Sequence, residues 1–320
     1  MIEAVDYTPK EYDLDTYRNY LTLKRRSLDQ FVYPWLTRLV TAIKVAQSPE
    51  IKDFSFSSDR LLFGDRGSGF LCNLSLLKQL LPIEQADVLI QGCGLGQEAL
   101  AWSHSQVSSC VGMDLFNFNA AWNKISQAAS DISGTSVSFL QGDICNTGFN
   151  NHSFDLISSG AVWEHVQNFD GLMQESHRLI KPEGIVFSTF GPLWCTYSGD
   201  HFSHIGGLEH GYNHLLLDLA NYSDWIDSFE SQESWAVSDD NYFEIRRHIR
   251  EGIFSYLKPS EYIQKVERFF KRVHTVTMIS PEAIAFRSTY PEKWQQLLEK
   301  GFTEEDLLIK ALILFLTPIP

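Results

Sequence analysis

The sequence predicts an α/β protein with a doubly wound sheet, in which mostly parallel strands are covered by helices on both faces. From Asp87 onward, short apolar segments alternate with helical segments, and the apolar segments contain few polar residues. Parallel strands that are buried on both faces have this composition, and the alternation is typical of a doubly wound sheet. A turn with three glycines, in the stretch VLIQGCGLGQEAL, joins the first of these strands to a helix. Such a turn indicates a nucleotide-like ligand at the carboxyl ends of the strands.

Composition narrows the class of protein. The chain has 320 residues, 44% hydrophobic and 21% charged, with a formal net charge of −14. This charge disfavours nucleic acid as a partner. The five cysteines form no CxxC pair, which favours a reducing compartment. With no secretory signal and no apolar run of about 20 residues, the sequence predicts a cytoplasmic protein that does not enter a membrane.

The strands and helices can be placed in order along the chain. Residues 1–83 are expected to form a mostly helical extension or lid, with a glycine-rich connection at 63–70. Five strands are expected at 87–92, 109–114, 137–143, 154–160 and 184–190, with helices between them. Residues 191–271 interrupt the alternation and are expected to form a cap over the substrate, ending in a helix that starts near Pro259. A strand at 273–280, a helix at about 294–309 and a strand at 311–317 complete the expected core, which spans 84–190 and 272–320.

The glycine spacing separates two kinds of nucleotide site. A dinucleotide fingerprint needs a third glycine where Gln97 stands, but here that glycine is Gly96, one residue earlier. Asp114 ends the second expected strand, where a carboxylate can accept hydrogen bonds from ribose hydroxyls. Asp143 is expected to end the third strand, where it can accept from an adenine amino group while Ile144 packs on the ring.

Four motifs carry a family resemblance: GCGLG (92–96), QGDI (141–144), FDLISSGAVWEHV (154–166) and LIKPEGIVFST (179–189). Together they resemble the class I S-adenosylmethionine-dependent methyltransferases, in particular their small-molecule, type-11-like group. The resemblance implies a Rossmann-like sheet of seven mostly parallel strands and S-adenosylmethionine as the cofactor. It covers residues 84–190 most closely and 272–320 less closely.

The resemblance also implies which residues hold the cofactor. Gly92, Cys93, Gly94 and Gly96 would approach the methionine part and the ribose, and Asp114 with Leu115 would take the ribose. Asp143 and Ile144 would contact the adenine, and Ser159 and Gly160 would lie beside the sulfonium. One departure is Ile90, because the family usually has an acid at this position, where it helps to orient the amino group of the cofactor.

Methyl transfer to a hydroxyl needs a positioned acceptor and a base, and a histidine suits that task. His165 lies in WEHV, and ubiquinone-type O-methyltransferases have a similar E-x-x-E-H segment that can hold a metal. Ala161 replaces its first acid, so no metal is expected. His201 and His204, in a histidine-rich segment at 199–214, are the other candidate bases, and Asp200 could orient the His201 ring.

These features predict a small-molecule methyltransferase, with a hydroxyl of a natural product, sugar or related metabolite as the acceptor. Acceptors that are methylated on nitrogen or carbon stay open. A methyltransferase fold that only binds a partner is an alternative, because Ile90 departs from the pattern. A nicotinamide-dependent oxidoreductase is a further alternative, which the early third glycine and the lack of a YxxxK pair disfavour. The sequence makes no prediction of the oligomeric state.

Overall fold

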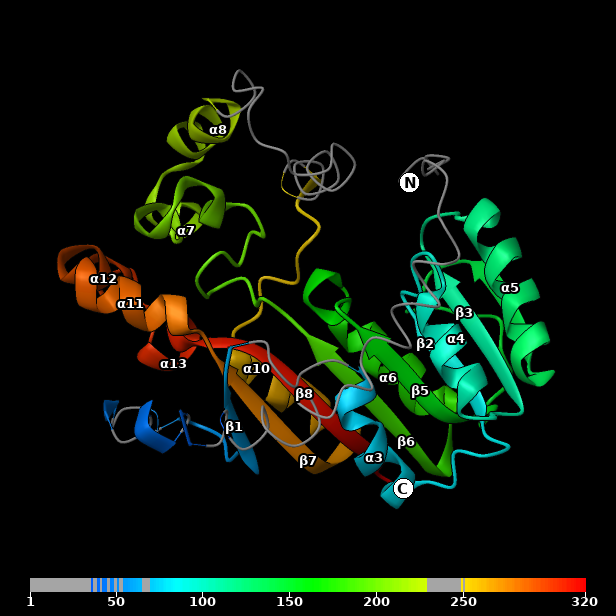
Figure 1. The fold of residues 1–320 in the computed structure, drawn as a ribbon. Helices are drawn as coiled ribbons and strands as arrows, with labels where there is room; N and C mark the ends of the chain where they lie inside the picture. Colours follow the sequence, from blue (N-terminus) through cyan, green and yellow to red (C-terminus); the bar gives the residue numbers. More distant parts are fainter. Residues whose placement is uncertain are drawn as a thin grey trace.

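The structure is a computed structural model, and it describes residues 54–64, 70–228 and 251–320, together with 36, 39–40, 42–44, 47–48, 51 and 249. One sheet of eight strands runs through it in the order β1-β7-β8-β6-β5-β2-β3-β4 (Figure 1). The strands are β1 (Arg60–Phe63), β2 (Asp87–Gln91), β3 (Ser109–Asp114), β4 (Ser136–Gln141), β5 (Phe154–Gly160), β6 (Ile180–Phe190), β7 (Phe270–Ile279) and β8 (Ile309–Pro318). Only β8 is antiparallel to its neighbours, and the other neighbouring pairs are parallel. The expected α/β sheet is confirmed.

The sheet has one strand more than the seven expected. Residues 1–83 were expected to form a mostly helical extension or lid, but β1 pairs in parallel with β7, with Arg60 opposite Val276 and Phe63 opposite Ile279. A four-residue strand at an edge depends on its partner, which here lies more than 200 residues away in sequence. Most of residues 1–53 of the expected helical extension, and residues 65–69 of the glycine-rich connection, lie outside the described residues.

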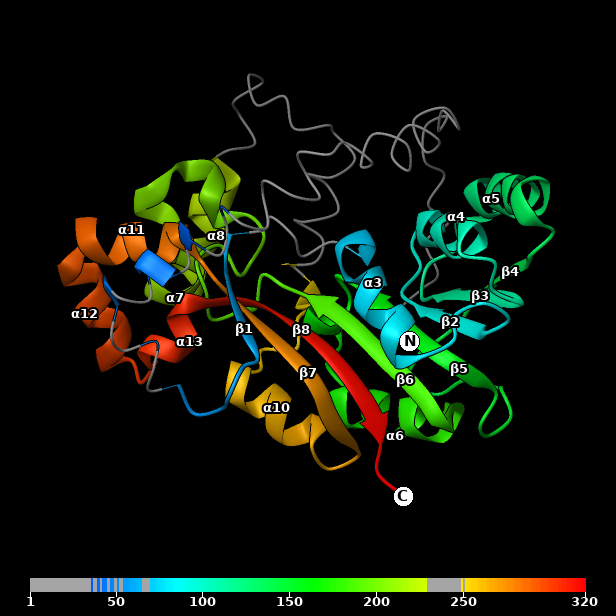
Figure 2. The ribbon, with the colours of Figure 1, turned by 60° about the horizontal axis from the view of Figure 1, so that its bottom comes forward.

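Helices cover both faces of the sheet, each with its own apolar core (Figure 2). On one face lie α3 (Phe70–Leu80), α4 (Gln97–His104) and α5 (Asn119–Ser133), which pack against alternate residues of the central strands such as Val88 and Ile90. On the other face lie α6 (Phe169–Leu179) and α10 (Pro259–Val266), which pack against the intervening residues such as Leu89 and Ile157. The near-continuous apolar composition of the strands is explained by these two cores.

β4 is an exception to this burial. It is the edge strand beyond β3, most of its side chains are exposed or half-buried, and Leu140 is 44% exposed. It also ends at Gln141, two residues before Asp143, which was expected to close it. The sequence pattern did not separate this edge strand from the buried ones.

After β6 the chain forms short helices in place of the core alternation. These are η4 (Ser203–Gly206), η5 (Leu208–His210), α7 (Asn213–Leu216) and α8 (Leu219–Ser228), and η3 (Trp163–His165) follows β5. Between β7 and β8 lie α11 (Pro281–Thr289), α12 (Pro291–Glu299) and α13 (Glu304–Leu308). In the part of the chain that the structure describes, no helix has both the length and the apolar character needed to span a bilayer.

Candidate active site

The site is built at the point where the strand order reverses. β2 pairs with β3 on one side and with β5 on the other, and Gln91 lies opposite Ser159 at the carboxyl ends of β2 and β5. β3 and β4 continue the sheet in one direction, and β5 and β6 continue it in the other. A crevice opens at such a switch point in parallel sheets, and ligands bind there.

The glycine turn follows β2 directly and lies at this switch point. Gly92, Gly94 and Gly96 have φ angles of 64°, 49° and 86°, in the left-handed region that glycine adopts without strain. A Cβ on Gly92 would lie 2.3 Å from Val162, and one on Gly96 would lie 2.6 Å from the ring of Phe139. A Cβ on Gly94 would meet no heavy atom of the described residues within 4 Å. Gly92 and Gly96 are therefore needed for packing, whereas Gly94 faces open space.

Asp114 fixes the turn from the neighbouring strand. Its Oδ2 accepts from the backbone N–H of Gly94 at 2.7 Å, and its Oδ1 accepts from that of Phe116 at 3.0 Å. Trp122 supports the same turn, since its Nε1–H donates to the Gly94 carbonyl at 2.7 Å. Burial raises the pKa of Asp114, which is 9% exposed. Among the described residues, Asp114 forms no ion pair with a lysine, arginine or histidine.

Glu98, which the sequence did not mark as a site residue, brings a second carboxylate from the first turn of α4 to β5. Its Oε1 accepts from Trp102 Nε1 at 2.9 Å and from the Ser158 hydroxyl of β5. A Cβ on Gly160 would lie 3.6 Å from the other oxygen, Oε2. Burial raises the pKa of Glu98. A single glutamate at the start of a helix has no spacing pattern that could have identified it.

The other expected cofactor residues surround the same crevice. Cys93 and Ser159 are buried, with the Ser159 hydroxyl donating to the Gln91 carbonyl at 3.3 Å. Gly160 ends β5 and is half-buried, while Leu115 follows Asp114 and is 43% exposed.

Neither side chain at the end of β2 offers a polar group to the crevice. Ile90 is 1% exposed and packs in the apolar core that β2 shares with α4. Gln91 is fully buried, donating from Nε2 to the Ser176 hydroxyl at 2.9 Å and accepting from Trp163 Nε1 at 3.4 Å. The amide of Gln91 therefore does not replace the acid that the resemblance expected at position 90.

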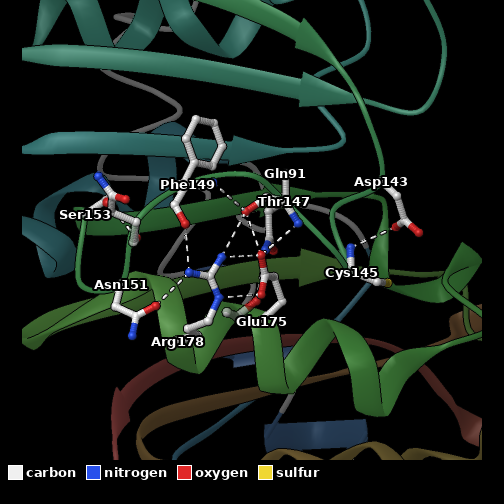
Figure 3. Close-up of polar contacts among 11 residues, drawn as sticks. Gln91, Asp143, Cys145, Thr147, Phe149, Asn151, Ser153, Glu175 and Arg178 are labelled. Carbon is white, nitrogen blue, oxygen red and sulfur yellow. Dashed lines mark hydrogen bonds and ion pairs between the residues drawn. The ribbon is translucent and has the colours of Figure 1, made fainter.

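The loop after β4 carries Asp143 and Ile144. Asp143 is exposed and its Oδ1 accepts from the Cys145 N–H at 2.8 Å, whereas Ile144 is buried. The loop is held by Glu175 of α6, whose Oε1 accepts from the N–H of Thr147 at 2.8 Å and from Arg178 Nη2 at 2.7 Å (Figure 3). This ion pair lowers the pKa of Glu175 to about 2, mainly through the hydrogen bonds from Arg178.

Two of the candidate histidines lie together, although they are far apart in sequence. The rings of His165 and His201 have centroids 4.9 Å apart, and His201 has a φ of 62°, a strained conformation for a residue with a side chain. Because a carbonyl can only accept, His165 Nδ1 must carry a proton toward Ile253 O, 3.0 Å away. Burial lowers the pKa of His165, so its ring is neutral at neutral pH with Nε2 able to accept.

Glu164 joins this pair, with ligand atoms of Glu164, His165 and His201 all within 4.8 Å of one another. Its Oε1 accepts from the Gly191 N–H at 3.0 Å. Its Oε2 is buried and accepts no hydrogen bond from the described residues. Burial raises the pKa of Glu164 to about 8. The sequence did not reveal that His201 would meet Glu164, and the absence of a metal stays a prediction.

His204 and His201 both line a cavity of about 490 Å³, together with Pro192, Tyr197, Ser198, Glu282 and Lys310. The Ser198 hydroxyl lies 2.8 Å from His204 Nδ1. Asp200, which was expected to orient His201, instead accepts from the N–H of Ser203 at 2.9 Å and from the Tyr222 hydroxyl at 2.5 Å. That expectation is wrong: Asp200 is fully buried and serves the packing of the insertion.

The fold and these motifs are similar to those of class I S-adenosylmethionine-dependent methyltransferase domains, which take S-adenosylmethionine as their cofactor. Residues 89–188 match the family described as a methyltransferase domain. The mitochondrial ubiquinone biosynthesis O-methyltransferase of Dictyostelium discoideum is 31% identical over 155 residues, which are 46% of this chain and 47% of that protein. The chain thus spans about half the length of this curated relative.

Several methyltransferases are among the solved structures that resemble this chain. An S-adenosylmethionine-dependent methyltransferase from Mesorhizobium loti is 15% identical, with a TM-score of 0.45 and coverage of 77% of this chain and 97% of that chain. A phosphoethanolamine N-methyltransferase 2 from Haemonchus contortus is 17% identical, with a TM-score of 0.44 and coverage of 78% of this chain and 52% of that chain.

Proposed function

We propose that the protein is an S-adenosylmethionine-dependent methyltransferase that methylates a hydroxyl of a small molecule. The observation that carries the proposal is the turn at Gly92–Gly96, tied to Asp114 and open at Gly94, at the switch point between β2 and β5. The open space at Gly94 and the two crevice carboxylates fit a cofactor that carries cationic groups. When bound, this cofactor supplies an activated methyl group, so the protein has to position the acceptor and take up its proton.

In this proposal each group of residues at the site contacts one part of the cofactor. Gly92, Cys93, Gly94 and Gly96 lie along the methionine part and the ribose, and Asp114 and Leu115 hold the ribose hydroxyls. Asp143 and Ile144 contact the adenine, and Ser159 and Gly160 face the sulfonium. The open face of Gly94 and the burial of Ile144 support these assignments.

The acceptor is assigned to the cavity beside His201 and His204, with a histidine as the general base. Val162 packs on Gly92 of the cofactor turn, η3 follows Val162 directly, and His165 in η3 contacts His201, which lines the cavity. The neutral ring of His165 supports the presence of a base in this region. The name of the Dictyostelium relative, an O-methyltransferase, supports a hydroxyl over a nitrogen acceptor.

The test is an assay for S-adenosylhomocysteine released when the full chain is incubated with S-adenosylmethionine and small molecules of three classes. Phenols and sugar alcohols carry hydroxyl acceptors, and amines serve as the comparison. The proposal predicts turnover with at least one hydroxyl compound. Turnover with amines alone would overturn the hydroxyl assignment, and cofactor binding without turnover on any class would favour a binding protein.

A further inference from the structure

The position of the Glu98 carboxylate would allow it to bind a ligand, although Glu98 belongs to none of the sequence motifs. It projects from the first turn of α4 to β5, where Ser158 and Trp102 both donate to its Oε1. These two donors come from different elements and fix the orientation of the carboxylate. Its other oxygen, Oε2, accepts no hydrogen bond from the described residues and points toward Gly160 at the end of β5.

The described residues leave space between Gly160 and Oε2 of Glu98. A Cβ placed on Gly160 would have Oε2, at 3.6 Å, as its only described heavy-atom neighbour within 4 Å. Glu98 itself is half-buried, so part of the residue stays accessible. Oε2 of Glu98 and Gly160 lie at the switch point between β2 and β5, where ligands of such sheets bind.

Among the described residues, no cation pairs with the carboxylate of Glu98. Glu98 forms no ion pair with a lysine, arginine or histidine of the described chain, and neither does Asp114 on the other side of the glycine turn. A partly buried carboxylate is costly unless a cation or hydrogen-bond donors compensate it. Only Oε1 of Glu98 has such donors, so Oε2 favours a ligand with a cationic donor.

We propose that Oε2 of Glu98 binds the α-ammonium group of S-adenosylmethionine. This inference rests on the proposed function, from which it takes the identity of the ligand. Ile90 and Gln91 give the crevice no polar side-chain group, so Glu98 makes a contact that the end of β2 does not make. The ammonium is preferred to the sulfonium because Oε2 is a hydrogen-bond acceptor, and only the ammonium can donate to it.

The experiment compares the affinities of three ligands by calorimetry for the wild-type full chain and for Glu98→Gln. The ligands are S-adenosylmethionine, S-adenosylhomocysteine and the deaminated form of S-adenosylhomocysteine, which lacks the ammonium but keeps the carboxylate. Glu98→Gln is expected to weaken the first two ligands about 10- to 100-fold and to leave the third unchanged. Glu84→Gln is the matched control, since this exposed glutamate pairs with Lys78 outside the crevice and its change should alter no affinity.

Each other outcome overturns the inference in a recognisable way. A loss for S-adenosylmethionine but not for S-adenosylhomocysteine would place Glu98 at the sulfonium. Equal losses for all three ligands would show a general effect on the crevice, and no loss would show that Glu98 is not a ligand. Failure of the wild type to bind S-adenosylmethionine would instead overturn the proposed function. If circular dichroism shows that Glu98→Gln does not fold, Glu98→Asp replaces it, with the same difference expected between ligands that have or lack the ammonium.

Discussion

Gly96 and Phe139 are in such close contact that a Cβ on the glycine would lie 2.6 Å from the ring. Phe139 also stacks on Trp122, with ring centroids 5.4 Å apart and an interplanar angle of 10°, and Trp122 donates to the Gly94 carbonyl. The shape of the glycine turn is thus coupled to aromatic packing between β4 and α5. Gly94, two residues earlier, faces open space instead.

This contrast predicts different losses of stability for two alanine substitutions. Gly96→Ala is expected to destabilise the fold by several kcal/mol, because the methyl group overlaps a ring that is itself packed. Gly94→Ala is expected to cost only the strain of its positive φ, about 1 to 2 kcal/mol, and to weaken cofactor binding by entering the crevice. Urea unfolding and calorimetry measure the two effects. An equal loss of stability in both variants would contradict this division of roles.

Asp114→Asn tests the carboxylate that fixes the turn. The substitution removes the charge while keeping a side chain of the same size, and hydrogen bonds to charged groups contribute about 1.5 to 3 kcal/mol. The affinity for S-adenosylmethionine should therefore fall about 10- to 100-fold in a calorimetric titration. Asp131→Asn, on the exposed surface of α5, is the control and should leave the affinity unchanged. If Asp114→Asn kept the wild-type affinity, Asp114 would not contribute to cofactor binding.

Substituting a candidate base should change turnover without changing cofactor affinity, and this distinguishes the bases from the residues that bind the cofactor. Alanine at His165, His201 or His204 is expected to leave cofactor affinity intact, and loss of the true base should reduce kcat by about 10²- to 10⁴-fold. His104→Ala, on the exposed side of α4, serves as the control. Steady-state kinetics with an accepted substrate give kcat, and titrations with the cofactor give its affinity. Unchanged kcat in all three variants would mean that no histidine of this group is the base.

The ion pair of Glu175 and Arg178 predicts a pH-dependent contribution to stability. The pKa of Glu175 is lowered from its ordinary value of 4.5 to about 2, and its side chain is 10% exposed. The stabilisation is therefore fully present above pH 4.5 and is lost as the pH falls through about 2. Arg178→Met should lower the free energy of unfolding at pH 7 by about 2 to 3 kcal/mol, with a smaller difference at pH 3.

Urea unfolding at a series of pH values measures this difference. Lys78→Met, which breaks the exposed pair with Glu84, should cost little at any pH. If the loss of stability in Arg178→Met stayed constant from pH 7 to pH 3, its cause would be lost packing and not the ion pair. Because this pair also holds the loop that carries Asp143 and Ile144, the variant should weaken cofactor binding as well.

The sequence predicted the elements whose signals are local. The alternation of strands and helices, the glycine turn and the final strands follow from periodicity and from residues such as Gly96 and Pro259. β1 was missed because its four residues are a strand only through their pairing with β7. The meeting of His165 with His201 depends on how the insertion folds back over η3, which no local pattern encodes. Glu98 was missed because one glutamate in a helix is ordinary in composition.

The site at Gly92–Gly96 is expected to bind S-adenosylmethionine. The most direct test of this expectation is a calorimetric titration of the full chain with S-adenosylmethionine, repeated with NADH, which the one-residue shift of the third glycine disfavours. We expect saturable binding of S-adenosylmethionine at one site per chain and no binding of NADH. Binding of NADH without S-adenosylmethionine, or of neither ligand, would contradict it.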